Sequence, residues 1–205
     1  MIFVSYYYDK APDKSTYYKD CALRVEQQLK QWNYKTNFDN INFDELGLNS
    51  SYLKLNMIKP TFLLDKLEEH QEAVIWIDAD CIVNNRLEEF EQLTDDVDIA
   101  YCIRHHDNKT PHAAVLYFGN TDNSKKFLRE WEAINKIKEK DETYDCSEHC
   151  TLIDQLNETK IPLNIIKFKN IAYSGAYEMG NRVSGIKIWI GISPDAWEYE
   201  RNKSR

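Results

Sequence analysis

The sequence predicts a single α/β domain spanning residues 1–205, in which helices flank a central, mostly parallel, twisted sheet. Short apolar runs alternate along the chain with longer segments that carry apolar residues at helical spacing. No linker rich in Pro, Gly or Ser divides the 205 residues, and this length suits one domain. The run AVIWI at residues 73–77 is apolar throughout, as in a strand buried on both faces.

Each element is predicted from its own local pattern. The expected strands, in chain order, are residues 2–7, 34–38, 73–77, 97–103, 113–118, 163–168 and 185–192. Helices are expected at residues 20–32, from Pro60 to His70, and at 122–138, where apolar side chains recur every three or four positions. Pro60 suits a first helical turn, and Asp122 or Asn123 could cap the third helix.

Composition excludes several classes of protein. The 26 basic and 34 acidic residues give a net charge of −8, which opposes binding to nucleic-acid phosphates. No apolar run approaches the roughly 20 residues that span a membrane, and residues 1–5 lack the pattern of a signal peptide. Five cysteines without a Cys-x-x-Cys pair predict no disulfide framework. We therefore expect a cytoplasmic protein.

Two aspartates, Asp78 and Asp80, follow the buried run directly and are separated by one small residue, Ala79. In an extended chain both carboxylates would point the same way, with Cα atoms roughly 6.5–7 Å apart. Two anionic groups so close favour a hard divalent cation such as Mg²⁺ or Mn²⁺ between them. The carboxyl ends of strands are also where open α/β sheets bind ligands. A solvated loop with two capping aspartates is the alternative reading.

This pair and its surroundings resemble the GT-A glycosyltransferases, enzymes that use nucleotide-sugar donors and carry Asp-x-Asp after a buried strand. The small size is similar to that of glycosyltransferases from large algal viruses, which would place the protein in the host cytoplasm. The segments that carry the resemblance are 59–67 with 74–80, AVLYFGNT at 114–121 with the helix after it, Asp154-Gln155 preceded by Glu148, and FVSY at 3–6.

The resemblance implies a metal-dependent transfer of a sugar from a nucleoside diphosphate donor to a glycan or protein-linked acceptor. The donor would be a UDP-sugar such as UDP-glucose or a related hexose. Asp80 would be the main ligand of Mn²⁺ or Mg²⁺, and Asp78 would touch the metal or the ribose. The remaining expected contacts are Lys59 and Lys187 to phosphate oxygens, and Ser5, Tyr6 and Asp39 to the base and ribose.

Asp154 would be the carboxylate beside the reacting sugar, either as a base or as a stabiliser of the oxocarbenium-like centre. An aspartate on the helix surface is its alternative reading. Many relatives supply a late histidine to the metal, whereas all five histidines here precede the last expected strand. The third protein ligand therefore stays open.

Two other functions compete with glycosyl transfer. Asp78-Ala79-Asp80 is similar to the aspartate pair of haloacid-dehalogenase-like phosphatases, although those enzymes carry the pair on an early strand. A non-catalytic module that binds nucleotide sugars on the same fold is the second alternative.

Overall fold

The computed structural model describes residues 1–8, 16–42, 56–104, 109–140, 148–169, 171–174 and 186–190. A six-stranded sheet in the order β2-β1-β3-β6-β5-β7 forms its centre, and only β6 runs against the other five strands. The predicted mostly parallel sheet is confirmed. Its strands are β1 (Ile2–Tyr7), β2 (Thr36–Asn40), β3 (Val74–Ile77), β5 (Ile99–Ile103), β6 (Pro111–Phe118) and β7 (Ile165–Phe168).

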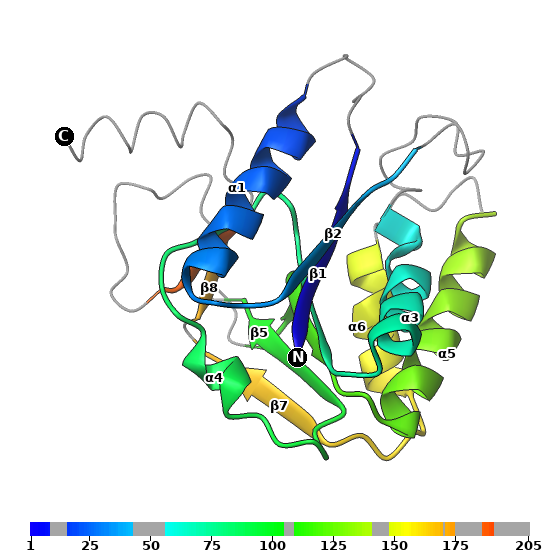
Figure 1. Ribbon diagram of the computed structural model, residues 1–205. Coiled ribbons are helices and arrows are strands. Elements are labelled where there is room, and N and C mark those ends of the chain that lie inside the picture. The colour runs from blue at the N-terminus through cyan, green and yellow to red at the C-terminus, as the bar shows by residue number, and fades with distance from the viewer. Residues whose placement is uncertain are drawn as a thin grey trace.

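Helices cover both faces of this sheet (Figure 1). On one face lie α3 (Lys59–His70), α5 (Asp122–Lys138) and α6 (Glu148–Glu158), and on the other lies α1 (Tyr17–Gln31). No helix in the described ranges has the length and apolarity needed to cross a membrane.

Alternate residues of the central strands feed two separate cores, because successive side chains of a strand point to opposite faces. Val74 and Trp76 of β3 pack with α3, α5 and α6, whereas Ile75 and Ile77 pack with α1. Burial of β3 on both faces, which its apolar run predicted, is therefore confirmed.

A smaller sheet, β4-β9-β8, extends the second core. It consists of β4 (Ile82–Val83), β8 (Ala172–Ser174) and β9 (Ile188–Ile190), and the short α4 (Glu88–Glu91) follows β4. We did not predict β4, β8 or α4, since two to four residues are too few to show a period. The last expected strand, residues 185–192, is shorter in the structure, and part of it lies outside the described residues.

Four of the cysteines lie in the described residues. Cys21, Cys81 and Cys102 are free and buried, whereas Cys150 at the start of α6 is disulfide-bonded. The expectation that the cysteines form no disulfide framework is therefore wrong at Cys150.

Gly119 ends β6 at a point where two segments of backbone approach closely. A Cβ atom there would lie 2.1 Å from the carbonyl oxygen of Val97, while the amide of Gly119 donates to the carbonyl of Asp98 at 2.9 Å. We expect Gly119→Ala to lower the free energy of unfolding by about 1–3 kcal/mol, as overpacking does. Urea unfolding checks this against Asn120→Ala, which alters an exposed neighbour and should stay within about 0.5 kcal/mol. Equal midpoints for the two variants would contradict the expected clash.

Candidate active site

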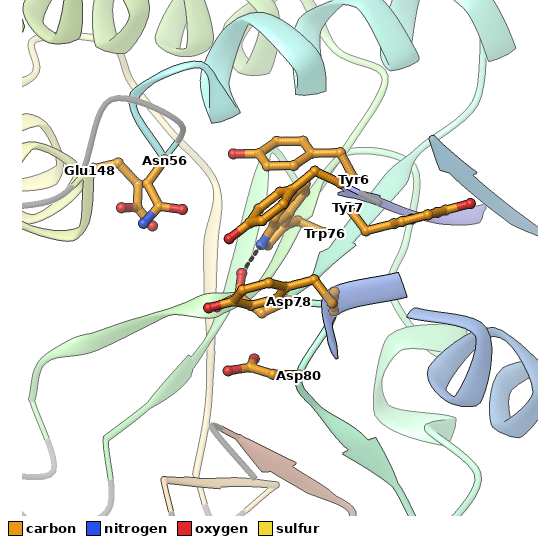
Figure 2. Close-up of a pocket in the computed structure, with 10 residues that line it drawn as sticks. Tyr6, Tyr7, Asn56, Trp76, Asp78, Asp80 and Glu148 are labelled. Carbon is orange, nitrogen blue, oxygen red and sulfur yellow. Dashed lines mark hydrogen bonds between the residues drawn. The ribbon is translucent and has the colours of Figure 1, made fainter. Parts of the chain in front are cut away.

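A pocket opens where the carboxyl ends of β1 and β3 lie side by side, because these two strands pair in parallel. β1 and the residue after it contribute Tyr6, Tyr7 and Tyr8, and the turn after β3 contributes Asp78 and Asp80. The remaining lining residues are Tyr18, Asn56, Trp76, Ala79 and Glu148. Figure 2 shows Glu148 and Asn56 on the side of the pocket opposite Tyr7.

The two aspartates sit on a tight turn rather than on extended chain. The amide of Cys81 donates to the carbonyl of Asp78 at 3.1 Å, and the chain reverses there to enter β4. Asp78 and Asp80 therefore do not project side by side from one strand, as the sequence analysis assumed. Both nevertheless face the same pocket.

Two side chains of helix α1 form hydrogen bonds with the backbone that follows this turn. Arg24 Nη2 donates to the carbonyl of Cys81 at 3.1 Å, and the amide of Val83 donates to Gln28 Oε1 at 2.9 Å. Arg24 and Gln28 are four residues apart, so they lie on the same face of the helix. The position of Asp80 is thus fixed to α1 as well as to the central sheet.

The carboxylate of Asp78 is anchored through one oxygen. Its Oδ1 accepts from the indole Nε1 of Trp76 at 2.6 Å, shown as the dashed line in Figure 2, and from Lys59 Nζ at 3.2 Å. Trp76 and Asp78 are two residues apart, which places both side chains on the α3 side of the sheet. This anchoring leaves Oδ2 as the oxygen of Asp78 that can face a ligand.

Lys59 lies beneath the pocket and has 1% of its surface exposed. Its ammonium donates to Asp78, to Glu148 Oε1 at 2.8 Å and to the carbonyl of Ala113 at 3.2 Å, and it stacks 4.6 Å from the centre of the Trp76 ring. Burial lowers the pKa of Lys59, but Asp78 and Glu148 outweigh this effect, so the pKa is raised and the lysine stays charged.

Glu148 is the first residue of α6 and is 5% exposed. One of its carboxylate oxygens, Oε1, binds Lys59, while Oε2 is buried and has no hydrogen-bond partner among the described residues. A buried carboxylate oxygen without a donor is costly, since desolvation is not offset by a hydrogen bond. This orphaned oxygen lies in a residue that lines the pocket, so a ligand hydroxyl could satisfy it.

Tyrosines form the wall of the pocket beside β1. The ring of Tyr8 lies 4.8 Å from that of Tyr18, and the ring of Tyr6 lies 4.8 Å from Trp76. Such rings offer flat apolar faces together with hydroxyl groups, a combination suited to stacking and hydrogen bonding of a base and ribose.

Crowded negative charge marks the position of Asp80. Its pKa is raised from 3.8 to about 6, mainly by burial and then by the neighbouring carboxylate of Asp78, while Lys59 and Arg24 oppose the shift. A divalent cation would relieve this repulsion, and carboxylate oxygens are the ligands that Mg²⁺ and Mn²⁺ prefer. The pair therefore fits a hard cation, although no group of three His, Cys, Asp or Glu ligands occurs within the described part of the chain. Two protein carboxylates, with ligand oxygens and water, would form the coordination shell.

The structure brings together part of the predicted site. Tyr6, Asp78 and Asp80 line the pocket as expected. Lys59 lies directly below it, but all three of its N–H groups are used by Asp78, Glu148 and Ala113. The prediction that Lys59 binds phosphate oxygens is therefore wrong, because the ammonium is buried and fully engaged.

Three other predicted ligands lie away from the pocket. Lys187 forms ion pairs with Glu88 at 2.5 Å and Glu89 at 2.9 Å, across the small sheet. Asp39 pairs with Lys66 of α3 at 2.9 Å. Ser5 is fully buried within β1, and its Oγ has no hydrogen-bond partner among the described residues. None of the three lines the pocket described above.

Asp154 is also not brought to the pocket, because it is exposed on α6. The same helix buries Glu148, Leu152 and Gln155, and residues 148 and 154 point roughly 120° apart around a helix of 3.6 residues per turn. The prediction of a carboxylate supplied by this helix fits Glu148 better than Asp154.

Sequence reasoning missed the contributions of Arg24 and Glu148. Glu148 shares a stripe with Leu152 and Leu156 at i, i+4 and i+8, the spacing of a buried helical face, and this signal could have found it. Arg24 lies three residues after the buried Cys21, on the helix that follows the first strand. Nothing in its sequence context shows that it reaches the turn at Cys81.

Comparison with known proteins finds similarity in structure but none in sequence. No protein family model matches this chain, and no curated protein matches it by sequence. Among solved structures, it is similar to a glycosyltransferase involved in the glycosylation of the major capsid of the virus PBCV-1. That match has a TM-score of 0.67 and 13% identity, and it covers 97% of this chain and 98% of the other.

Two further structures agree. The galactosyltransferase LgtC, in complex with donor and acceptor sugar analogs, matches with a TM-score of 0.59, 12% identity, and coverage of 100% of this chain and 94% of the other. The glycosyltransferase GlyE of Streptococcus pneumoniae TIGR4 matches with a TM-score of 0.53 and 13% identity, over 82% of this chain and 44% of the other. The resemblance found in the sequence is confirmed in the architecture: this chain has the GT-A glycosyltransferase fold.

Proposed function

We propose that this protein is a metal-dependent glycosyltransferase that moves a hexose from a UDP-sugar, such as UDP-glucose, to a glycan or protein-linked acceptor. One observation carries the proposal. Asp78, Asp80 and Glu148 line one pocket at the carboxyl ends of β1 and β3, and Oε2 of Glu148 has no hydrogen-bond partner among the described residues. The structures similar to this chain are named as glycosyltransferases, and one of them was solved with donor and acceptor sugar analogs.

Donor binding is assigned to the turn after β3 and to the tyrosines beside β1. Asp80, with the free oxygen of Asp78, would hold Mn²⁺ or Mg²⁺, which when bound neutralises the charge on the departing diphosphate. A net charge of −8 makes this cation necessary, because an acidic protein and an anionic donor otherwise repel each other. Tyr6, Tyr8 and Tyr18 would contact the base and ribose. Uridine itself is favoured only by the resemblance.

Glu148 takes the role that the sequence analysis gave to Asp154. Its Oε2 accepts a hydrogen bond from a hydroxyl, either of the donor sugar or of the attacking acceptor, and can take the proton of that hydroxyl. Lys59 holds the other oxygen, so the carboxyl group of Glu148 keeps its position while the proton is transferred.

The phosphatase alternative is disfavoured by the fold, because the solved structures similar to this chain are named as glycosyltransferases. Only a measurement of turnover distinguishes the second alternative, a non-catalytic binding module, from an enzyme.

Calorimetry with UDP, in the presence and absence of Mn²⁺, tests the binding part of the proposal. We expect UDP to bind at least about tenfold more tightly with Mn²⁺, since each tenfold step corresponds to about 1.4 kcal/mol, a modest gain for a bridging cation. Equal affinity in both conditions would contradict the bridging role. A panel of UDP-sugars assayed for UDP release then tests catalysis, and binding without release would favour the non-catalytic module.

A further inference from the structure

The ammonium of Lys59 joins four elements at one point. Lys59 begins α3, Asp78 follows β3, Ala113 lies on β6 and Glu148 begins α6. All three acceptors lie within 3.2 Å of Nζ. An ammonium group has three N–H donors, so its hydrogen-bonding capacity is filled by these oxygens. None is left to reach into the pocket.

Each carboxylate in this cluster gives Lys59 one oxygen. Oδ1 of Asp78 and Oε1 of Glu148 accept from the lysine, while Oε2 of Glu148, a residue that lines the pocket, has no donor among the described residues. Asp78 has a second anchor in the indole of Trp76. Glu148 has no other donor among the described residues, so Lys59 alone fixes its orientation.

Charge gives a second reason for the cluster. Without Lys59, the carboxylates of Asp78 and Glu148 would lie near each other and near Asp80 in a partly desolvated site. One buried cation compensates part of this charge and still leaves the pocket negative enough to attract a divalent cation. Lys59 therefore brings together two carboxylates with different tasks.

We propose that Lys59 is a positioning residue, which fixes the orientation of Glu148 relative to Asp78 and so sets the sugar-facing carboxylate against the diphosphate site. This proposal rests on the proposed function. It predicts that Lys59 affects turnover through Glu148 and affects donor binding little, because Asp78 keeps the bond from Trp76 when the lysine is removed.

A double-mutant cycle tests the proposal through the variants Lys59→Met, Glu148→Gln and the two combined. Turnover is measured as UDP release from a UDP-sugar, and donor affinity as calorimetry with UDP and Mn²⁺. We expect Lys59→Met to lower kcat about 10²-fold in the wild-type background and less than about threefold in the Glu148→Gln background. The affinity for UDP with Mn²⁺ should stay within about threefold in every variant that folds.

The matched control is Lys66→Met on the same helix. Lys66 is also buried, at 7% exposure, and is also paired with two carboxylates, Asp39 and Glu69, neither of which lines the pocket. Its loss should leave kcat unchanged. Comparable slowing in Lys66→Met and Lys59→Met would show a general effect of losing a buried lysine and would overturn the proposal.

The combined variant also guards against misfolding of Lys59→Met, because it removes opposite charges together. It should turn over at the rate of Glu148→Gln alone. A further loss of tenfold or more in the combined variant would show that Lys59 acts by another route. An active wild type with an equally active Lys59→Met would overturn the positioning role alone, whereas a wild type that releases no UDP would overturn the proposed function as well.

Discussion

Replacing Glu148 with Gln is expected to slow sugar transfer by about 10²–10⁴-fold, the usual loss when a general base is removed. The substitution keeps the size of the side chain, and the amide oxygen can still accept from Lys59. The unpartnered oxygen Oε2 is then replaced by an NH₂ group, which donates a hydrogen bond where the carboxylate oxygen accepted one. Because this group acts mainly in the transition state, the affinity for UDP with Mn²⁺ should change less than about threefold. Steady-state UDP release combined with calorimetry measures both quantities.

Asp154→Asn is the paired variant, since it makes the same chemical change six residues along the same helix. The side chain of Asp154 is exposed and lies away from the pocket, so we expect its turnover to stay within about threefold of wild type, which is under 1 kcal/mol of barrier. The opposite result, a slow Asp154→Asn and a normal Glu148→Gln, would return the catalytic role to Asp154.

Replacing Asp80 with Asn is expected to abolish Mn²⁺-dependent UDP binding while making the unliganded protein more stable. The pKa of Asp80 is about 6 when the chain is folded, against 3.8 for the ordinary side chain. A raised pKa means that the folded state prefers the protonated form. The ionised carboxylate therefore destabilises the fold by on the order of 3 kcal/mol at pH 7.

The pH dependence has a definite sign. Below about pH 3 Asp80 is protonated in both the folded and the unfolded state, so wild type and Asp80→Asn should have nearly equal stability. Between about pH 4 and pH 6 only the unfolded chain ionises, so the stability of wild type falls while that of the variant does not, and the difference is nearly complete by pH 7. Thermal unfolding in EDTA from about pH 3 to pH 8 measures this difference. An Asp80→Asn variant less stable than wild type at pH 7 would show a structural role for the carboxylate.

Adding Mn²⁺ and UDP should make wild type more stable than Asp80→Asn. With Mn²⁺ and UDP at a hundred times the dissociation constant, wild type gains about 2.7 kcal/mol and the variant gains nothing. Glu148→Gln is the control here, because it should keep the full response. The carboxylate of Asp80 would then destabilise the unliganded protein and stabilise the protein bound to Mn²⁺ and UDP.

Much of the fold was predictable because its signals are local. The apolar run that became β3, the helical spacing of α5 and the proline near the start of α3 each depend on neighbouring residues. Thr121 caps α5 by accepting from the amide of Ser124, one residue before the cap we expected. The signal of the aspartate pair is also local, since Asp78 and Asp80 directly follow a buried strand.

The rest of the site depends on tertiary contacts. Lysines are mostly exposed, so nothing in the sequence suggested that Lys59 is buried between Asp78 and Glu148. Lys187 likewise finds its partners on α4, far earlier in the chain. The choice between Asp154 and Glu148 was different in kind. The apolar stripe of α6 favours Glu148, whereas the resemblance of Asp154-Gln155 to the family motif does not depend on which face of the helix is buried.

The pairing of β4 with β9 has a consequence for how the protein forms. Ile82 of β4, two residues after Asp80, pairs with Trp189 of β9, near the other end of the chain. During synthesis the ribosome releases Asp80 long before it makes this partner, so the nascent chain presents the aspartates beside an unpaired strand edge. Contacts between distant segments are slow to form, because their loop-closure entropy comes first. Pairing of β4, which follows the two aspartates, is therefore a late step, and a stalled chain would carry both aspartates beside an unpaired β4.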